Sequence, residues 1–406
     1  MLTYPPVSGF DAAEHIEQAR DLWAGRGLPE GSYTPPGFHL LAGATIEVAE
    51  ALGADVPEAG GQLLNVLFAL GTAALVAWLA HLVFPGRPVL RWAALAFFVC
   101  VPIVLKTTAM FHPQPLATFL ITLALALCVR MVVQARYAPA DWLALAATLA
   151  AAQLVRSVAL WAVVAVLVTL VVAAVAQEEH RRRIVRPLAV AGAAIVLVPL
   201  PWYVYLAATG SNPVFGRATS VLRTQGYLPP SFYFSPGLPE LVTDPHRGAS
   251  SPRFLPILYS DTWGDYFGIW SWGPPRPELT PEVNRRLVLQ NAAGLPLTAL
   301  GLAGWVALAL LTRRRWREAP AHVLVVLAPL LGLLAALYYG TRSGTSDGDT
   351  VKAMFLLPAV PFWALCFGFA ADVLAGRGRR LAVPVLALLG ACGLVCLTFA
   401  FYPAVS

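Results

Sequence analysis

The apolar residues of this chain come in repeated blocks, each close to the ~20 residues that an α-helix needs to cross a bilayer. Hydrophobic residues make up 58% of the 406 positions and charged residues only 12%, about half the charged share of a soluble globular domain. The pattern predicts an all-α, polytopic transmembrane bundle of about ten spans. The expected spans are 60–84, 91–109, 112–133, 141–155, 157–176, 187–208, 290–312, 320–339, 353–374 and 381–402.

The apolar block from Asp141 to Ala176 is too long for a single span. Gln153 and Arg156 lie near its middle, and an ionisable side chain inside hydrocarbon is unfavourable. We therefore expect two short helices separated by a turn at Arg156.

Arginine placement predicts the orientation, because short loops rich in Lys and Arg stay in the cytoplasm. Five arginine clusters fall in alternate linkers, which agrees with a turn at Arg156. We therefore explain the net charge of +6 by membrane orientation rather than by nucleic-acid binding. The clusters are Arg87 and Arg91; Arg130 and Arg136; Arg181, Arg182, Arg183 and Arg186; Arg313, Arg314, Arg315 and Arg317; and Arg377, Arg379 and Arg380.

This orientation divides the chain into four parts. We expect extracytoplasmic juxtamembrane helices over 1–59, an N-terminal transmembrane bundle over 60–208, an extracytoplasmic loop over 209–289 and a C-terminal transmembrane bundle over 290–406. Residues 1–59 then lie outside the membrane with no span to carry them there, so we expect a further transmembrane helix upstream of Met1.

An acidic motif opens the chain at Asp11, followed by Glu14 and His15. With Gln18 these positions share one helical face, while apolar residues form the other, so the segment is typical of an amphipathic helix at the outer leaflet. Asp11 could hold a carboxylate at the membrane surface for chemistry. Asp11 with Glu14 also fits a helix N-cap and capping box, which would make the pair structural.

Other polar and aromatic residues of the predicted outer face are candidate ligands. Tyr33 precedes two prolines that open a second amphipathic helix, where the acids could equally be solvated surface groups. His112 lies in the turn between two spans, and Arg156 needs an anion or an acid as a partner. Each of the two is either a phosphate ligand or a structural residue.

The long outer loop and the last outer turn supply further candidates. Trp263 belongs to a run of aromatic residues that could stack on sugars or lipid chains, or could anchor the loop at headgroup level. Asp261 and Asp265 flank Trp263 and could be acids of the site, although acids of such a loop are more commonly exposed. Lys352 leads into a span, where its amine could meet a lipid-linked phosphate or simply snorkel to the interface.

Together these motifs resemble the GT-C glycosyltransferases that use polyprenyl-phosphate sugars, including protein O-mannosyltransferases, aminoarabinose transferases and bacterial family 39 relatives. Asp11 to His15 is similar to the family's first acidic motif, although the family usually has two adjacent acids and Ala12 follows Asp11 here. Tyr33 to Pro36 resembles the aromatic-Pro-Pro segment, His112 to Leu116 resembles the second short outer loop, and Lys352 with Leu356 to Pro358 resembles a late basic segment. The family's first span has no counterpart in this sequence.

The resemblance implies transfer of a sugar from a polyprenyl-phosphate donor to an acceptor hydroxyl at the extracytoplasmic face of the plasma membrane. Asp11 is then expected to be the general base, and Lys352, Arg156 and His112 to stabilise the leaving phosphate, with Glu14 and His15 orienting Asp11 or the acceptor. The acceptor can be a protein, a lipid or a polysaccharide. A divalent metal is possible, and inversion at the anomeric carbon is the family's usual outcome. The competing hypothesis is a transporter or lipid flippase without covalent chemistry, although no internal repeat with midplane polar residues is visible.

Overall fold

The structure, a computed structural model, describes residues 4–28, 32, 34–209, 228–237, 240–245, 252–268, 281–343, 348, 350–377, 383–391 and 393–394. All regular secondary structure in these residues is helical, as the apolar blocks predict. Among the described residues, seven helices are long and apolar enough to cross a membrane, or eight if the bent pair α4–α5 is one span, and α7 is a shorter apolar helix. The chain is a multi-pass membrane protein.

The first half of the bundle follows the predicted spans closely. Its helices are α3 (Ala59–Val83), α4 (Pro88–Cys100), α5 (Pro102–Ala109), α6 (Gln114–Val133), α7 (Pro139–Val155), α8 (Leu160–Ala176), α9 (Arg181–Leu197) and α10 (Leu200–Ala208). Two points differ from a set of straight spans. The expected span 91–109 is bent by 51° between α4 and α5, where Pro102 restricts the backbone of Val101 to an extended conformation. The turn predicted at Arg156 is present, because Arg156 has extended dihedrals (φ −152°, ψ 126°) and ends α7.

The second half contains α15 (Pro281–Arg315), α16 (Ala321–Ser343), the 3₁₀ helix η3 (Ala353–Ala359) and α17 (Val360–Arg377). Helix α15 begins inside the segment expected to be loop, and that segment also holds the short helices α12 (Pro230–Phe234), α13 (Glu240–Thr243) and α14 (Phe254–Trp263). Half of the predicted last span, 381–402, lies outside the described residues.

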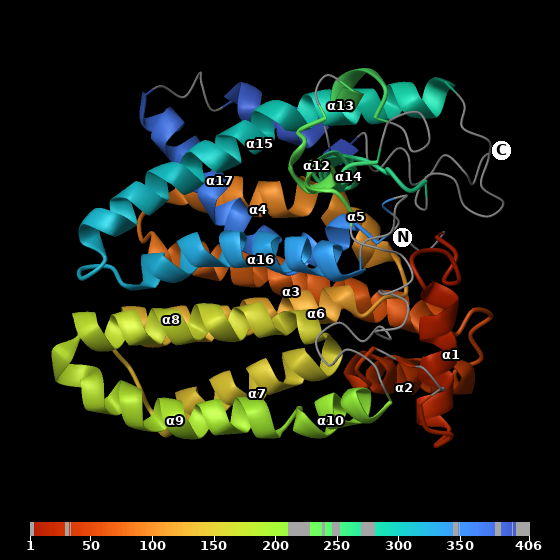
Figure 1. Cartoon of the computed structure of the whole chain (residues 1–406), viewed down its shortest axis with the longest axis horizontal. Coiled ribbons are helices and arrows are strands. Elements are labelled where there is room, and N and C mark those ends of the chain that lie inside the picture. The colour runs from red at the N-terminus through yellow and green to blue at the C-terminus, as the bar shows by residue number, and fades with distance from the viewer. Residues whose placement is uncertain are drawn as a thin grey trace.

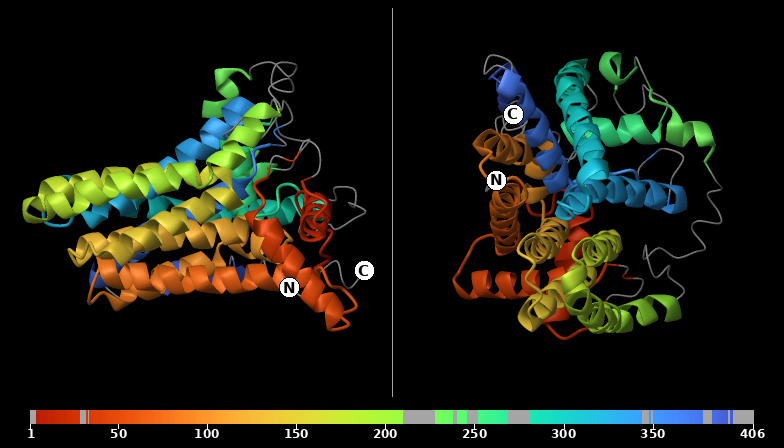
Figure 2. Two further views of the ribbon diagram at one scale, coloured as in Figure 1. Left: turned by 90° about the horizontal axis from the view of Figure 1, so that it is seen from below. Right: turned by 90° about the vertical axis from the view of Figure 1, so that its left-hand side faces the viewer.

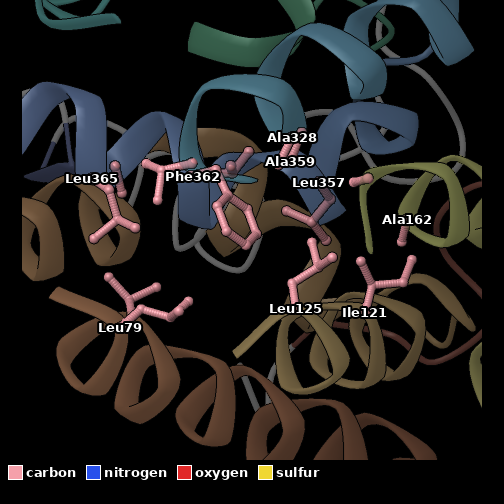
Figure 3. Packing of buried hydrophobic residues seen from close by; sticks show 14 of the residues in the cluster. Leu79, Ile121, Leu125, Ala162, Ala328, Leu357, Ala359, Phe362 and Leu365 are labelled. Atoms are coloured by element: carbon pink, nitrogen blue, oxygen red, sulfur yellow. The ribbon is translucent and has the colours of Figure 1, made fainter. Parts of the chain in front are cut away.

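Long helices run side by side, with α1 (Ala12–Trp23) and α2 (Gly37–Ala51) across one end of the bundle (Figures 1 and 2). The core lies where η3 and α17 pack among α3, α4, α6 and α16, and Leu357 and Phe362 point toward Leu79 and Leu125 (Figure 3). Helix α1 packs on α2 at very short range, because a Cβ at Gly43 would lie 2.5 Å from the carbonyl oxygen of Ala19.

The described arginines of the five clusters lie at the opposite end, called here the arginine-rich end. Arg87 after α3 bonds Asp372 of α17 at 3.1 Å, Phe84 stacks on His322 at the start of α16 at 5.2 Å, and Tyr137 after α6 donates to Gln177 after α8 at 2.6 Å. These contacts join the linkers after α3 and α15 to the end of α17, and the linker after α6 to the linker after α8. Both groups lie on the side of the bundle away from α1 and α2 (Figure 1). The other end, with α1 and α2, is called the α1 end.

Candidate functional site

Asp11 and Lys352 meet at the α1 end. Lys352 Nζ lies 3.7 Å from Asp11 Oδ2, and the two side chains are 18% and 38% exposed. Asp11 has a left-handed backbone conformation (φ 55°), which a non-glycine residue adopts rarely and which is concentrated at functional sites. Its position is the N-cap of α1, yet its side chain makes no capping hydrogen bond. The capping-box alternative is therefore wrong for the Asp11 side chain, which faces Lys352 instead.

Two aromatic rings support the lysine. Lys352 Nζ lies 4.3 Å from the centre of the Phe10 ring, a cation–π distance, and Phe10 makes an edge contact with Phe267 at 5.4 Å. Lys352 is thus held between Asp11 and an aromatic surface that includes the segment after α14.

Beneath Asp11 lies a buried histidine cluster formed by His15, His39 and His112, which are at most 3% exposed. His39 Nδ1 is 3.3 Å from the carbonyl oxygen of Pro35, which can only accept, so Nδ1 carries the hydrogen and Nε2 of the neutral ring is bare. His15 Nδ1 is 3.1 Å from His39 Nε2 and therefore donates to it. His112 Nδ1 accepts the backbone N–H of Gln114 at 3.1 Å, so its hydrogen lies on Nε2. Each ring has one fixed tautomer.

The environment keeps these rings neutral. Burial lowers the pKa of His39 to about 3, with Arg156 adding to the effect and the bond to Pro35 opposing it. Burial, then the neighbouring His112 and His39, and then Arg156 and Lys352 hold the pKa of His15 well below its ordinary value. Burial followed by Arg156 and Lys352 does the same for the pKa of His112. The positive charge of the site therefore belongs to Arg156 and Lys352, not to the histidines.

Arg156 borders an apolar cavity of about 240 Å³. Its guanidinium lies 5.8 Å from the centre of the Phe355 ring, and Phe355 follows Lys352 on η3. The rest of the lining comes mainly from α8 and α16, with Trp161, Val164, Ala335 and Tyr338 among its residues. A cation at one wall of an apolar slot can bind an anionic headgroup attached to a hydrocarbon chain.

A second ion pair, Lys106 with Asp261, is almost fully buried, with side chains 3% and 0% exposed. Lys106 Nζ donates to Asp261 Oδ1 at 2.7 Å, to the Asp261 carbonyl at 2.7 Å and to the Gly264 carbonyl at 2.5 Å. The backbone N–H of Ala353 donates to Asp261 Oδ2 at 2.7 Å. The pair thus joins α5, α14 and η3 immediately beside Lys352.

The other predicted site residues occupy different positions. Glu14 is exposed, whereas His15 and Gln18, expected on the same polar face, are buried, so the face that α1 presents to the bundle includes polar residues. Tyr33 lies outside the described residues. Asp265 is half-buried, and its charge adds to burial in raising the pKa of Tyr4.

Trp263 corrects the expectation of an exposed stacking surface. It is 3% exposed, its indole N–H donates to Thr298 at 2.9 Å, and its ring packs edge-on against Phe97. The ring also fills the space that a side chain at Gly294 would need. Trp263 packs α14 against α4 and α15, so neither the interfacial belt nor sugar stacking describes it.

Sequence reasoning identified neither His39 nor Lys106 as a residue of the site, although His39 lies three residues after Pro36 and Lys106 precedes the His112 turn. For Asp261 the structure excludes the exposed loop acid, because its side chain is fully buried. Within the residues that the structure describes, no group of three His, Cys, Asp or Glu side chains could hold a metal ion. In the histidine cluster, both Nδ1 and Nε2 of His39, Nδ1 of His15 and Nδ1 of His112 already take part in hydrogen bonds.

Comparison with protein-family models gives no match, and comparison with curated proteins gives none either. Solved structures do match. ArnT from Cupriavidus metallidurans bound to undecaprenyl phosphate aligns with a TM-score of 0.54 at 17% identity, over 96% of this chain and 60% of ArnT. The archaeal oligosaccharyltransferase AglB from Archaeoglobus fulgidus, in complex with an inhibitory peptide and a dolichol-phosphate, aligns with a TM-score of 0.55 at 14% identity, over 99% of this chain and 52% of AglB.

The Archaeoglobus fulgidus oligosaccharyltransferase in complex with Zn and sulfate aligns with a TM-score of 0.57 at 13% identity, covering 97% of this chain and 48% of the enzyme. The chain thus spans roughly half to three fifths of the length of these enzymes. At such identities the likeness concerns the fold, and it agrees with the resemblance found in the motifs. The chain therefore shares its transmembrane fold with ArnT and with the Archaeoglobus fulgidus oligosaccharyltransferase.

Proposed function

We propose that this protein is a membrane glycosyltransferase that moves a sugar from a polyprenyl-phosphate donor to an acceptor hydroxyl at the extracytoplasmic face of the plasma membrane. The observation that carries the proposal is the 3.7 Å approach of Lys352 Nζ to Asp11 Oδ2. A carboxylate and an amine from distant parts of the sequence meet at the end of the bundle opposite the arginine clusters. By the positive-inside rule, that end faces away from the cytoplasm.

The reaction needs a base and a stabilised leaving group. Asp11 takes the proton of the acceptor hydroxyl while the hydroxyl oxygen bonds to the anomeric carbon of the sugar. The bond from that carbon to the phosphate oxygen breaks, and polyprenyl phosphate leaves with the electron pair. Lys352 and Arg156 stabilise the negative charge that develops on this phosphate. Attack from the face opposite the phosphate inverts the anomeric centre, as in most members of the superfamily.

The cavity beside Arg156 suits the donor. Its apolar walls on α8 and α16 fit a polyprenyl chain, and Arg156 and Phe355 lie on the side that leads to Lys352. The neutral histidine cluster fits a supporting role better than phosphate binding, because His15 and His112 are almost fully buried and carry no charge. We therefore assign the phosphate to Lys352 and Arg156, and the support of α1 beneath Asp11 to the histidines.

The resting ion pair also gives an order of events. Before the donor binds, Lys352 neutralises Asp11 across 3.7 Å. The phosphodiester of the donor carries one negative charge, as the carboxylate does, but its oxygens can be shared between Lys352 and Arg156. Donor binding would then draw Lys352 away from Asp11 and leave the carboxylate available to the acceptor hydroxyl.

Asp11→Asn tests the base. We expect sugar transfer to fall by about 10²–10⁴-fold, because an amide cannot take the proton. Undecaprenyl phosphate should still bind, since the amide leaves Lys352 and Arg156 in place. The measurement is transfer of radiolabelled sugar from polyprenyl-phosphate donors in membranes, alongside binding of sugar-free undecaprenyl phosphate.

Glu17→Gln is the matched control, because Glu17 lies on the same helix and is exposed. It should keep nearly full transfer. Unchanged transfer in Asp11→Asn membranes would remove the proposed base, and a transport activity without sugar transfer would favour the flippase hypothesis.

A further inference from the structure

The segment that carries Lys352 is held by a buried ion pair. Asp261 uses both carboxylate oxygens: Oδ1 accepts from Lys106 and Oδ2 accepts from the backbone N–H of Ala353, the residue that follows Lys352. Neither side chain is more than 3% exposed. Lys352 itself is extended (φ −109°, ψ 129°) and is the N-cap of η3, so fixing the Ala353 N–H fixes the base of the lysine side chain.

Burying two charges is unfavourable unless each is fully satisfied by hydrogen bonds. Lys106 meets this condition with three acceptors, all from Asp261 and Gly264 at the end of α14. An apolar pair of similar volume would hold three helices together equally well in many proteins. The ionic pair adds a precise acceptor for one backbone N–H, which apolar side chains cannot supply.

The same segment supports the lysine from a second side. Three residues after Gly264, Phe267 packs on Phe10, and Phe10 lies under Lys352 Nζ at 4.3 Å. The end of α14 and the residues after it therefore fix both the backbone and the amine of Lys352.

We infer that Lys106 and Asp261 are positioning residues that hold Lys352 in place to bind the phosphate of the lipid-linked donor. The inference rests on the proposed function for the identity of this ligand. It assigns a role in the site to two residues that lie in a transmembrane helix and in the loop region, and that do not themselves touch the donor.

The chain contains a matched control at its other end. Asp141 bonds Arg130 through Oδ1 and accepts the backbone N–H of Ala138 through Oδ2 at 3.3 Å, so it also combines a cation with a backbone N–H. This pair belongs to the arginine-rich end, where the proposed reaction has no residues. Removing this pair therefore shows the effect of losing such a carboxylate when the position of Lys352 is unchanged.

The experiment compares the double variants Lys106→Met/Asp261→Leu and Arg130→Met/Asp141→Leu. Each removes the two buried charges together, and Arg136, which also lies 3.4 Å from Asp141, is 67% exposed, so no unpaired charge is left buried. Binding of sugar-free undecaprenyl phosphate is measured in detergent, and the acylation rate of Lys352 by an amine-selective reagent is followed by mass spectrometry. For the first variant we expect the Kd to rise about tenfold and acylation of Lys352 to accelerate. For the control variant both should stay within about twofold of wild type.

Lys352→Met supplies the coupling test. If Lys106 and Asp261 act through Lys352, adding Lys106→Met/Asp261→Leu to Lys352→Met should weaken binding of undecaprenyl phosphate no further. An undiminished additional loss would overturn the inference, as would a folded first variant with unchanged affinity and unchanged acylation. If wild-type protein does not bind undecaprenyl phosphate, the proposed donor is wrong. The positioning role is then judged by acylation alone, which faster labelling supports and an unchanged rate refutes.

Discussion

Lowering the pH from 7.5 to 5.5 is expected to reduce the free energy of unfolding by about 4 kcal/mol through the histidine cluster alone. His15, His39 and His112 stay neutral in the folded protein across this range, because burial and the charges of Arg156 and Lys352 lower each pKa. In the unfolded chain each ring binds a proton near its ordinary pKa of about 6.5. The unfolded state therefore gains about 1.4 kcal/mol per histidine over these two pH units, and the folded state gains nothing.

Acidification lowers the stability because the pKa of each of these histidines is lower in the folded protein than in the unfolded chain. Stability is fully present above pH 6.5, falls as the pH drops through that value, and keeps falling until the folded rings themselves protonate, near pH 3 for His39. Protonation would also break the hydrogen bond between His15 and His39, since a protonated His39 could no longer accept from His15.

The measurement is the denaturant-unfolding free energy in micelles at a series of pH values. His39→Gln should remove about a third of the slope between pH 7.5 and 5.5. Phe38→Leu is the control, because Phe38 packs on the His39 ring at 5.6 Å and does not titrate. It should lower stability at every pH and leave the slope unchanged. An equal slope in His39→Gln and wild type would mean that the cluster is already protonated or already open in the folded state.

Much of the bundle was predictable because span length and arginine placement are local properties of the sequence. The turn at Arg156 followed from one guanidinium in the middle of an apolar block, and the structure confirms it. The bend between α4 and α5 was missed although Pro102 marks it, because an uninterrupted apolar run conceals a change of direction. The early start of α15 at Pro281 was missed because its first turns are polar.

The site was only partly predictable. Asp11 and Lys352 were identified through the resemblance of short motifs, and their approach to 3.7 Å agrees with the expected convergence at one end of the bundle. For Asp261 the sequence left a site acid and an exposed loop acid both open, because a loop acid gives no local sign of burial. Only the arrival of Lys106 from α5 and Ala353 from η3 satisfies its charge and its second oxygen. Trp263 was misjudged, since the groove against Gly294 exists only in the assembled bundle.

A bulky residue at Gly304 should produce the other large loss of stability. Helix α15 crosses α17 at this glycine, where an added Cβ would lie 2.0 Å from the carbonyl oxygen of Cys366. The neighbouring atom is backbone and cannot rotate away, so the two helices must separate. We expect Gly304→Ala to cost about 1–3 kcal/mol and Gly304→Leu to cost more, because overpacking at a close helix crossing is not relieved by rotamer changes.

Gly301→Ala is the control, since it lies one turn away on α15 and a Cβ there meets nothing within 4 Å. It should be neutral or stabilising by up to about 1 kcal/mol, because alanine favours the helix over glycine. Thermal unfolding in detergent separates the two outcomes. The crossing also matters to the site, because α17 continues directly from η3 and Lys352 precedes η3. Gly304→Ala protein that remains folded should therefore bind undecaprenyl phosphate more weakly than Gly301→Ala protein. Equal stability of the two variants would show that α15 and α17 do not approach this closely.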